Sequence, residues 1–325
     1  MKTIFRCTLL LLSVAFLFSC NHAPESNHSN GEKLSGDLTI FHAGSLSVPM
    51  KIIADSFMHT YPDVKVLLEA DGSVKCARKI IDLQKPCDIM ASSDYSVIDS
   101  MLIPDYANWN ALFAGNEICL VYTDKSRYAN EINRNNWFEI LQKKEVSYGR
   151  SDPDSDPCGY RSVLTMKLSE LFYKQKGLTA KLTHKNKEYI RPKEVDLLSL
   201  LESQSVDFIF LYRSVAEQHH LKYLILPDSI NLKKQELAGL YKQVSIEIRG
   251  DKPGKTKTMK GEPMIYGITI LKNAPNKKVA IEFLHYMLSH DKGLKIMKQN
   301  GQTIISPAIV KDHDRLPNKL RAITK

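Results

Sequence analysis

Short apolar runs alternate with helical patterns along most of this chain, and this alternation limits the folds that it can adopt. The runs lie at residues 38–42, 64–68, 88–91, 118–122, 208–212 and 223–226. Strands separated by helices are typical of α/β proteins, in which a helix returns the chain across a parallel sheet. We therefore predict an α/β fold with mainly parallel sheets. A chain of 325 residues is long enough to form two domains.

The one long apolar run lies at the N-terminus, where Lys2 and Arg6 precede the apolar residues 9–18. It is shorter than the roughly 20 residues that a membrane-spanning helix needs, and basic residues before a short apolar core are typical of an export signal. Its Leu-Phe-Ser-Cys ending resembles the bacterial lipoprotein signal, in which the cysteine becomes the lipidated first residue. We predict a lipoprotein signal peptide over 1–20, ending at the lipidated Cys20. An uncleaved anchor helix is the alternative.

Residues 21–35 contain mostly Asn, His, Ser, Gly and Glu, with almost nothing to bury. Such composition predicts a flexible tether between the membrane and the folded part. The net charge of +9 falls to +7 without Lys2 and Arg6. This excess modestly favours encounter with anions, although a solvated surface accounts for most of it. Nucleic acid is not an expected partner.

Four of the six cysteines remain once Cys7 leaves with the signal and Cys20 carries the lipid. They are Cys76, Cys87, Cys119 and Cys158. No pair among them has the spacing of metal ligands. An oxidising compartment would permit a Cys76–Cys87 disulfide, but connectivity cannot be deduced from sequence. Buried free thiols are the interpretation we favour, and the disulfide state stays open.

Four predicted helix starts carry most of the chemical information. They lie at Ser47, Ser73, Asp156-Pro157 and Arg191-Pro192, each before apolar residues at helical spacing. A helix N-terminus exposes unpaired N–H groups and the positive end of the dipole, so several converging starts could bind an oxyanion. Any one of these residues by itself is more often only a helix cap.

Six segments together resemble the tungstate/molybdate-binding proteins of ABC importers, a branch of the solute-binding proteins common in archaea. The segments are residues 41–49, 72–74, 156–162, 191–195, 212–216 and 266–276. The similarity runs from about Gly36 to near Pro307 in the same order throughout. It is far more specific than a single glycine motif.

The resemblance implies a two-lobed type II periplasmic binding protein, with the ligand in a cleft between the lobes and two crossing strands. We expect the crossings near 115–116 and near 262–264. Residues 36–115 and 264–325 would then form a discontinuous lobe 1, and residues 116–263 would form lobe 2. The open or closed resting state is not predicted.

The resemblance also places eight residues around the oxyanion. From lobe 1, Gly44 and Ser45 would supply backbone and hydroxyl donors and Ser73 a hydroxyl. From lobe 2, Asp156 would supply a carboxylate and Cys158 a backbone N–H, while Pro157 has no N–H and is included for its proximity alone. The remaining two are Glu194, with a second carboxylate, and Tyr212, with a phenol donor.

Two carboxylates beside a dianion are repulsive unless something compensates. At ~4 Å and an effective dielectric of ~20, each pair of unit charges costs roughly 4 kcal/mol. The resemblance implies that Asp156 and Glu194 each donate an oxygen to the Mo or W atom, raising it from tetrahedral toward six-coordination. Sulfur in sulfate does not readily expand in this way, so the repulsion itself would give selectivity.

Each of these residues also has a simpler structural interpretation. Glu194 could be a solvated glutamate in a first helical turn, Asp156 only a helix cap, and Tyr212 a core tyrosine with a satisfied hydroxyl. Arg161 and Arg213 are expected to be structural or lobe-surface partners rather than anion ligands. The adjacent His219 and His220 are expected at the surface, because neighbours on a helix point to different faces.

The expected function is the substrate-binding component of an ABC transporter, delivering tungstate or molybdate to a permease in the inner membrane. The protein would be a lipid-anchored monomer at the periplasmic face of the membrane, with no cofactor and no catalytic residues. The preferred metal and the identity of the permease are left open. A binding protein for another oxyanion such as sulfate is the first alternative. A secreted enzyme is the second, although Cys-x-x-Cys, Gly-x-Ser-x-Gly and His-Glu-x-x-His motifs are absent.

Overall fold

The computed structural model describes residues 33–250 and 254–325. The predicted signal at 1–20 and the predicted tether up to residue 32 lie outside the described residues. In the two ranges that are described, no helix has the length and apolar character needed to cross a membrane.

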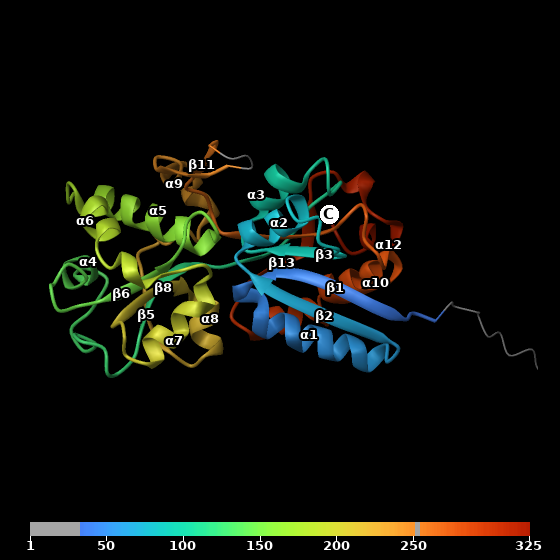
Figure 1. Cartoon of the computed structure of the whole chain (residues 1–325), viewed down its shortest axis with the longest axis horizontal. Helices are drawn as coiled ribbons and strands as arrows, with labels where there is room; N and C mark the ends of the chain where they lie inside the picture. Colours follow the sequence, from blue (N-terminus) through green and yellow to red (C-terminus); the bar gives the residue numbers. More distant parts are fainter. Residues whose placement is uncertain (1–32, 251–253) are drawn as a thin grey trace, which may run out of the picture. The chain divides into compact units, whose positions relative to one another are not determined.

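A six-stranded sheet with the strand order β13-β4-β12-β3-β1-β2 forms one part of the structure (Figure 1). Its strands are β1 (Gly36–Ala43), β2 (Val64–Asp71), β3 (Ile89–Ser92), β4 (Ala111–Gly115), β12 (Ile265–Ile270) and β13 (Thr303–Val310). β1 runs parallel to β2 and β3, whereas β12 is antiparallel to β3 and β4. β13 is antiparallel to β4 at the sheet edge.

Helices cover this sheet because their apolar residues recur at helical spacing. They are α1 (Ser47–Thr60), α2 (Ser73–Ile81), α3 (Tyr95–Val97), α10 (Lys277–Leu288), α11 (Gly293–Gln299) and α12 (Asn318–Arg321). α1 buries the face carrying Met50, Ile53 and Phe57, as its periodicity predicts. Phe57 meets Phe283 of α10 edge to face at 5.2 Å, which joins α1 and α10 in one core.

A five-stranded sheet with the order β7-β6-β8-β5-β9 forms the second part. Its strands are β5 (Ile118–Tyr122), β6 (Tyr148–Ser151), β7 (Ile190–Arg191), β8 (Phe208–Tyr212) and β9 (Lys222–Ile225). The helices of this part are α4 (Trp137–Ile140), α5 (Pro157–Phe172), α6 (Leu178–His184), α7 (Leu197–Glu202), α8 (Arg213–Gln218) and α9 (Ala238–Tyr241). α5 is buried along most of its length, so it is the central helix of this part.

The chain passes between the two sheets where β4 ends at Gly115 and β5 begins at Ile118, and it returns before β12 at Ile265. The α/β fold with two lobes is therefore confirmed. The bounds 36–115 with 264–325 and 116–263 stay a prediction, and they define the names lobe 1 and lobe 2 below.

The prediction of mainly parallel sheets is wrong, because both sheets are mixed. β6 is parallel to β7 and β8, but β5 is antiparallel to β8 and β9. In lobe 1, the departing strand β4 lies beside the returning strand β12, so the two must run in opposite directions. The apolar periodicity of a strand carries no information about its direction.

Three of the four predicted helix starts are confirmed. Asp156 is the N-cap of α5 with Pro157 next to it. Ser47 is the first residue of α1, after a 3-10 turn at Gly44–Leu46, and Ser73 is the first residue of α2, although neither serine side chain caps its helix. The fourth start differs. After Pro192 the chain forms a 3-10 turn at Glu194–Asp196 before α7 begins. Tight turns at these points bring backbone N–H groups to the interface between the lobes.

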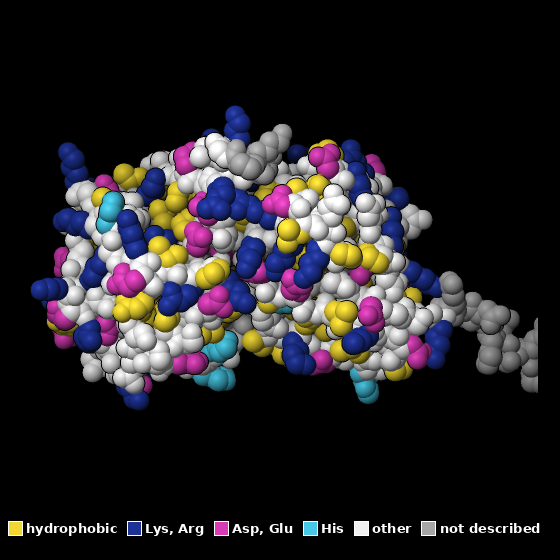
Figure 2. Space-filling model, viewed as in Figure 1, with side chains coloured by type: hydrophobic (Ala, Val, Ile, Leu, Met, Phe, Trp, Pro, Cys, Tyr) yellow, Lys and Arg dark blue, Asp and Glu magenta, His cyan; other side chains and the backbone are white. Residues whose placement is uncertain are grey.

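An antiparallel hairpin of β10 (Ser245–Arg249) and β11 (Thr256–Lys260) forms a separate two-stranded sheet. Arg78 of α2 donates from Nη2 to the carbonyl oxygens of Arg249 and Gly250, both at 3.1 Å. The hairpin therefore contacts lobe 1, although its residues belong to lobe 2. Figure 2 shows Lys and Arg side chains interspersed with Asp and Glu over this face, in keeping with a solvated surface.

Candidate functional site

The loop after β1 brings lobe 1 into direct contact with Glu194 of lobe 2. The backbone N–H of Ser45 donates to Oε1 of Glu194 at 2.5 Å. A Cβ atom on Gly44 would lie 3.1 Å from Oε2 of Glu194, so a larger residue would crowd the carboxylate. Gly44, Ser45 and Glu194 are all buried. The structure therefore brings these three predicted site residues together.

The loop after β2 makes the equivalent contact with Asp156. A Cβ atom on Gly72 would lie 2.3 Å from the carbonyl oxygen of Ser155 and 3.1 Å from Cβ of Asp156. Only glycine fits this approach without a shift of the backbone. The next residue, Ser73, accepts a hydrogen bond at Oγ from the N–H of Ser93 at 3.1 Å. Ser73 is thus at the same interface, with its hydroxyl engaged by lobe 1.

Asp156 and Glu194 are buried acids that each keep one oxygen without a protein partner. Asp156 accepts at Oδ1 from the N–H of Cys158 at 3.2 Å, the N-cap bond of α5. Within residues 33–250 and 254–325, Oδ2 of Asp156 and Oε2 of Glu194 have no hydrogen-bond partner of acceptable geometry. Both residues have 0% relative exposure. Glu194 is therefore not the solvated first-turn acid that sequence alone could have explained, whereas Asp156 is a helix cap that also keeps a buried free oxygen.

Burial and mutual repulsion act on the protonation of these two acids. Burial raises the pKa of Asp156. Burial, followed by the negative charge of Asp156, raises the pKa of Glu194 well above its usual value. Two close carboxyl groups in a dry site share a proton unless a cation or an electrophilic centre compensates their charge. The site therefore has a strong demand for positive charge.

Tyr212 ends β8 with its hydroxyl at the same interface. Its OH accepts from Nη1 of Arg161 at 3.3 Å and donates to Oγ of Ser93 at 3.5 Å. Burial raises the pKa of Tyr212, so the phenol stays a neutral hydrogen-bond donor. Tyr212 is fully buried and belongs both to the core and to the contact between the lobes.

Cys158 contacts Asp156 through its backbone N–H rather than through its thiol. Burial raises the pKa of the Cys158 thiol well above its usual value, and Sγ donates weakly to the carbonyl oxygen of Phe210 at 3.8 Å. All four cysteines in the described part of the chain are free and buried, consistent with the buried free thiols that we favoured over a disulfide. Pro157 has no N–H and only begins α5 beside Asp156.

Three polar residues of this region were not predicted from the sequence. Tyr266 donates to Oγ of Ser45 at 3.1 Å, and Asn116 donates from Nδ2 to the Tyr266 hydroxyl at 2.9 Å. Ser151 is fully buried near Asp156, and among the described residues its hydroxyl has no hydrogen-bond partner. The segment beginning at Tyr266 and the crossing at Asn116 were both recognised, but their side-chain contacts could not be inferred.

The two arginines considered above have structural partners, and the two adjacent histidines lie at the surface. Arg213 forms ion pairs with Glu117 at 2.8 Å and Glu217 at 2.5 Å, so it is a structural partner as predicted. Arg161 is also a structural partner, but it is buried between the lobes rather than at a lobe surface. His219 and His220 are exposed, as predicted.

The groups of the candidate site come from both lobes. Two carboxylate oxygens, a backbone amide and several hydroxyl groups meet where the lobes touch. In the described residues, no three His, Cys, Asp or Glu side chains are grouped as a site for a free metal ion. A binding protein that encloses its ligand between two lobes is the class that this fold and site define.

Comparisons with known proteins agree with that class. The solved structure of the Azotobacter vinelandii periplasmic molybdate-binding protein matches with a TM-score of 0.61, over 82% of this chain and 99% of that chain. At 17% identity, this likeness shows the fold alone. The chain belongs to the family of bacterial extracellular solute-binding proteins, whose model matches residues 38–302.

Relatives of known sequence cover nearly the whole chain. An uncharacterized solute-binding protein of Petrotoga mobilis is 42% identical over 326 residues, covering 100% of this chain and 98% of that protein. The molybdate/tungstate-binding protein WtpA of Thermococcus kodakarensis is 40% identical over 347 residues, covering 98% of this chain and 95% of that protein. These relatives are solute-binding proteins rather than enzymes.

Proposed function

We propose that this protein is the solute-binding component of an ABC importer for tungstate or molybdate. The observation that carries the proposal is the pair Asp156 and Glu194, each fully buried with one unpartnered oxygen at the contact between the lobes. Around this pair lie the amide of Ser45 and the hydroxyls of Ser73 and Tyr212. The relatives named molybdate/tungstate-binding protein support the choice of ligand.

The two carboxylates select the ligand by the chemistry of its central atom. Hydrogen-bond donors alone would bind any tetrahedral dianion, and buried acids would then only weaken binding. Mo and W accept additional oxygen ligands, so Asp156 and Glu194 each add one oxygen and bring the centre toward six-coordination. Sulfate retains the repulsion without the added bonds, which makes it a poor competitor.

The proposed site uses donors from both lobes, so binding and closure are linked. Gly44 and Ser45 approach Glu194, while Gly72 and Ser73 approach Asp156. An oxyanion held by both loops stabilises the closed form and is shielded from water. The closed protein then delivers its cargo to a membrane permease.

The proposed location is the outer face of the cytoplasmic membrane. The signal-like residues 1–20 and Cys20 support export followed by lipid anchoring, with residues 21–35 as the tether. The protein acts as a monomer that carries its ligand without a cofactor and without chemical change.

A thermal-shift panel with tungstate, molybdate, sulfate and phosphate tests this proposal. A ligand at about 100 times its Kd stabilises the folded protein by about 2.7 kcal/mol. Tungstate and molybdate are expected to raise the Tm by several degrees, whereas sulfate and phosphate leave it unchanged. A shift with sulfate and none with tungstate would identify an ordinary oxyanion site and overturn the metal-directed role of the carboxylates.

A further inference from the structure

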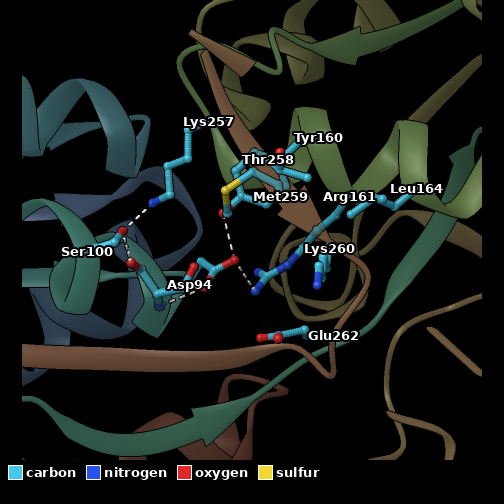
Figure 3. Close-up of a pocket in the computed structure, with 11 residues that line it drawn as sticks. Asp94, Ser100, Tyr160, Arg161, Leu164, Lys257, Thr258, Met259, Lys260 and Glu262 are labelled. Atoms are coloured by element: carbon cyan, nitrogen blue, oxygen red, sulfur yellow. Dashed lines mark hydrogen bonds and ion pairs between the residues drawn. The ribbon is translucent and has the colours of Figure 1, made fainter. Parts of the chain in front are cut away.

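A second buried contact joins the lobes close to the proposed site. Asp94 follows β3 in lobe 1, and Arg161 lies on α5 in lobe 2. Nη2 of Arg161 is 2.9 Å from Oδ2 of Asp94, with side-chain exposures of 3% and 9%. Nη1 of Arg161 also donates to the carbonyl oxygen of Ser93 at 2.6 Å. Figure 3 shows the guanidinium of Arg161 directed at Asp94 from the opposite side of the pocket.

The partners of Asp94 are complete. Tyr160 donates its hydroxyl to Oδ2 of Asp94 at 2.6 Å, and the N–H of Ser96 donates to Oδ1 at 2.9 Å. Burial alone would raise the pKa of Asp94, but the charge of Arg161 and these donors lower it. Asp94 is therefore ionised in the closed arrangement, and its charge is neutralised by lobe 2 rather than by its own lobe.

The same guanidinium reaches the proposed oxyanion site. Nη1 of Arg161 lies 3.3 Å from the Tyr212 hydroxyl, which in turn lies 3.5 Å from Oγ of Ser93. Oγ of Ser93 lies 3.3 Å from Oγ of Ser73. Tyr212 and Ser73 are both proposed ligand residues, so the ion pair and the site share one hydrogen-bond network.

One helix carries both groups. Asp156 is the N-cap of α5 and Arg161 lies in its second turn, so a rigid movement of α5 brings both to lobe 1 together. Separation of the lobes would expose Asp94 and Arg161 to water and break every contact between them. A buried ion pair contributes little to net stability, yet its geometry is demanding and specifies one arrangement of its partners.

We propose that Asp94 and Arg161 form a latch between the lobes, which positions Tyr212 and holds the closed, ligand-bound state. This inference rests on the proposed function. The latch does not touch the ligand. It lowers the rate at which the lobes separate, and therefore the rate of oxyanion release.

A pocket of about 200 Å³ adjoins the latch and explains how release could begin there. Its wall includes Asp94, Ser96 and Ser100 from lobe 1 and Tyr160, Arg161 and Lys260 from lobe 2. Water that enters this pocket would lie next to the ion pair and solvate its charges as they part. The latch is therefore the accessible end of the interface, whereas Asp156 and Glu194 lie fully buried.

The test compares tungstate dissociation and association rates by stopped-flow for wild type, Asp94→Asn, Tyr160→Phe and Arg161→Met. Affinity changes that arise from closure appear mainly in the dissociation rate. We expect Asp94→Asn and Arg161→Met to dissociate at least tenfold faster and Tyr160→Phe a few-fold faster, with association within about threefold of wild type. Tyr160→Phe keeps both charges of the ion pair. It therefore still tests the latch if the other variants fail to fold.

Arg127→Gln is the matched control, because Arg127 pairs with Asp207 at 3.4 Å and both lie in lobe 2. It is expected to release tungstate at the wild-type rate. The double variant Asp94→Asn/Arg161→Met should dissociate no faster than the faster single variant, since both changes remove one interaction.

The outcomes separate the latch from the proposed function. Unchanged dissociation in the variants, with tight binding by wild type, would overturn the latch alone. Slower dissociation in Asp94→Asn would also overturn it, because the freed Arg161 would then be attracting the anion directly. If wild type bound neither tungstate nor molybdate, the proposed function and the role of the latch in it would fall together.

Discussion

Two buried groups of charged residues where the lobes meet differ in how completely their charges are paired. At Asp94 and Arg161, opposite charges meet at 2.9 Å and neighbouring groups occupy the remaining positions. Five residues earlier on the chain, Asp156 lies near Glu194, a group of the same charge, and each retains a buried oxygen without a partner. Both groups are buried at the interface between the lobes.

The difference indicates what each contact is for. A buried charge with full pairing is satisfied by the protein itself and can serve only to define the closed arrangement. Buried acids with free oxygens destabilise the protein unless something else binds them. We therefore assign the ligand to Asp156 and Glu194 and the closure to Asp94 and Arg161.

Glu194→Gln is expected to have the largest effect on binding. Glutamine keeps the size of the side chain but is a much poorer ligand for Mo or W, so tungstate affinity should fall at least ~100-fold, or about 2.7 kcal/mol. Isothermal titration calorimetry measures this loss. Glu202→Gln, at the exposed end of α7, is the control and should bind like wild type.

The same substitution should stabilise the ligand-free protein. The folded-state pKa of Glu194 lies above its unfolded value, so its ionisation opposes folding as pH rises through the folded pKa. Removing the ionisable group at neutral pH should raise the Tm by about 2 °C for each kcal/mol gained. A lower Tm for Glu194→Gln without ligand would show that the carboxylate stabilises the fold and would weaken the comparison.

Gly72→Ala should have the next largest effect. Its Cβ would lie 2.3 Å from the carbonyl oxygen of Ser155, so the lobes could not close fully. We expect tungstate affinity to fall roughly tenfold, or about 1.4 kcal/mol, as measured by calorimetry. In Gly239→Ala the new methyl group meets nothing within 4 Å, so this control should retain wild-type affinity. Equal affinities for the two variants would contradict the close approach at Gly72.

Tyr212→Phe should have a smaller effect. It removes one neutral hydrogen-bond donor, which contributes about 0.5–1.5 kcal/mol, so affinity should fall between about twofold and tenfold. Tyr148→Phe is the control, because Tyr148 is also buried and donates to the carbonyl oxygen of Leu182 at 2.6 Å within lobe 2. A similar affinity loss in both variants would assign Tyr212 to the core of lobe 2 rather than to the ligand.

The smallest expected effect near neutral pH is the dependence of tungstate affinity on pH. Coordination requires both carboxyl groups to be ionised, and protonation of Glu194 becomes favourable above the usual glutamate pKa of about 4.3. Tungstate affinity should therefore decrease as pH falls, beginning above that range, by at most about tenfold per pH unit for one proton. Glu194→Gln should show a weaker dependence, because only Asp156 is left to titrate, and an identical profile in both proteins would exclude Glu194 as its source.

Much of the site could be predicted because it lies in short segments with a local signature. Asp156 and Pro157 predict the start of α5 from two adjacent residues, and the resemblance placed Gly44 and Tyr212 in the predicted site. The burial of Glu194 could not be predicted in this way. It depends on the loop at Ser45, which is 149 residues away in sequence.

The directions of the strands and the latch were missed for the same physical reason. The neighbours of β5 and β12 depend on how the chain crosses between the sheets, which no local pattern specifies. Asp94 and Arg161 are 67 residues apart in the sequence numbering, and their pairing exists only where the lobes meet. Arg161 could be recognised as a structural partner but not as a buried one.

The most direct test of the central claim is the coordination of tungsten in the bound protein, measured by X-ray absorption at the tungsten edge. The two carboxylates predict a six-coordinate centre, with two added oxygen neighbours that disappear in the double variant Asp156→Asn/Glu194→Gln. A tetrahedral, four-coordinate centre in the wild-type complex would contradict this account, because Asp156 and Glu194 would then not be ligands of the metal.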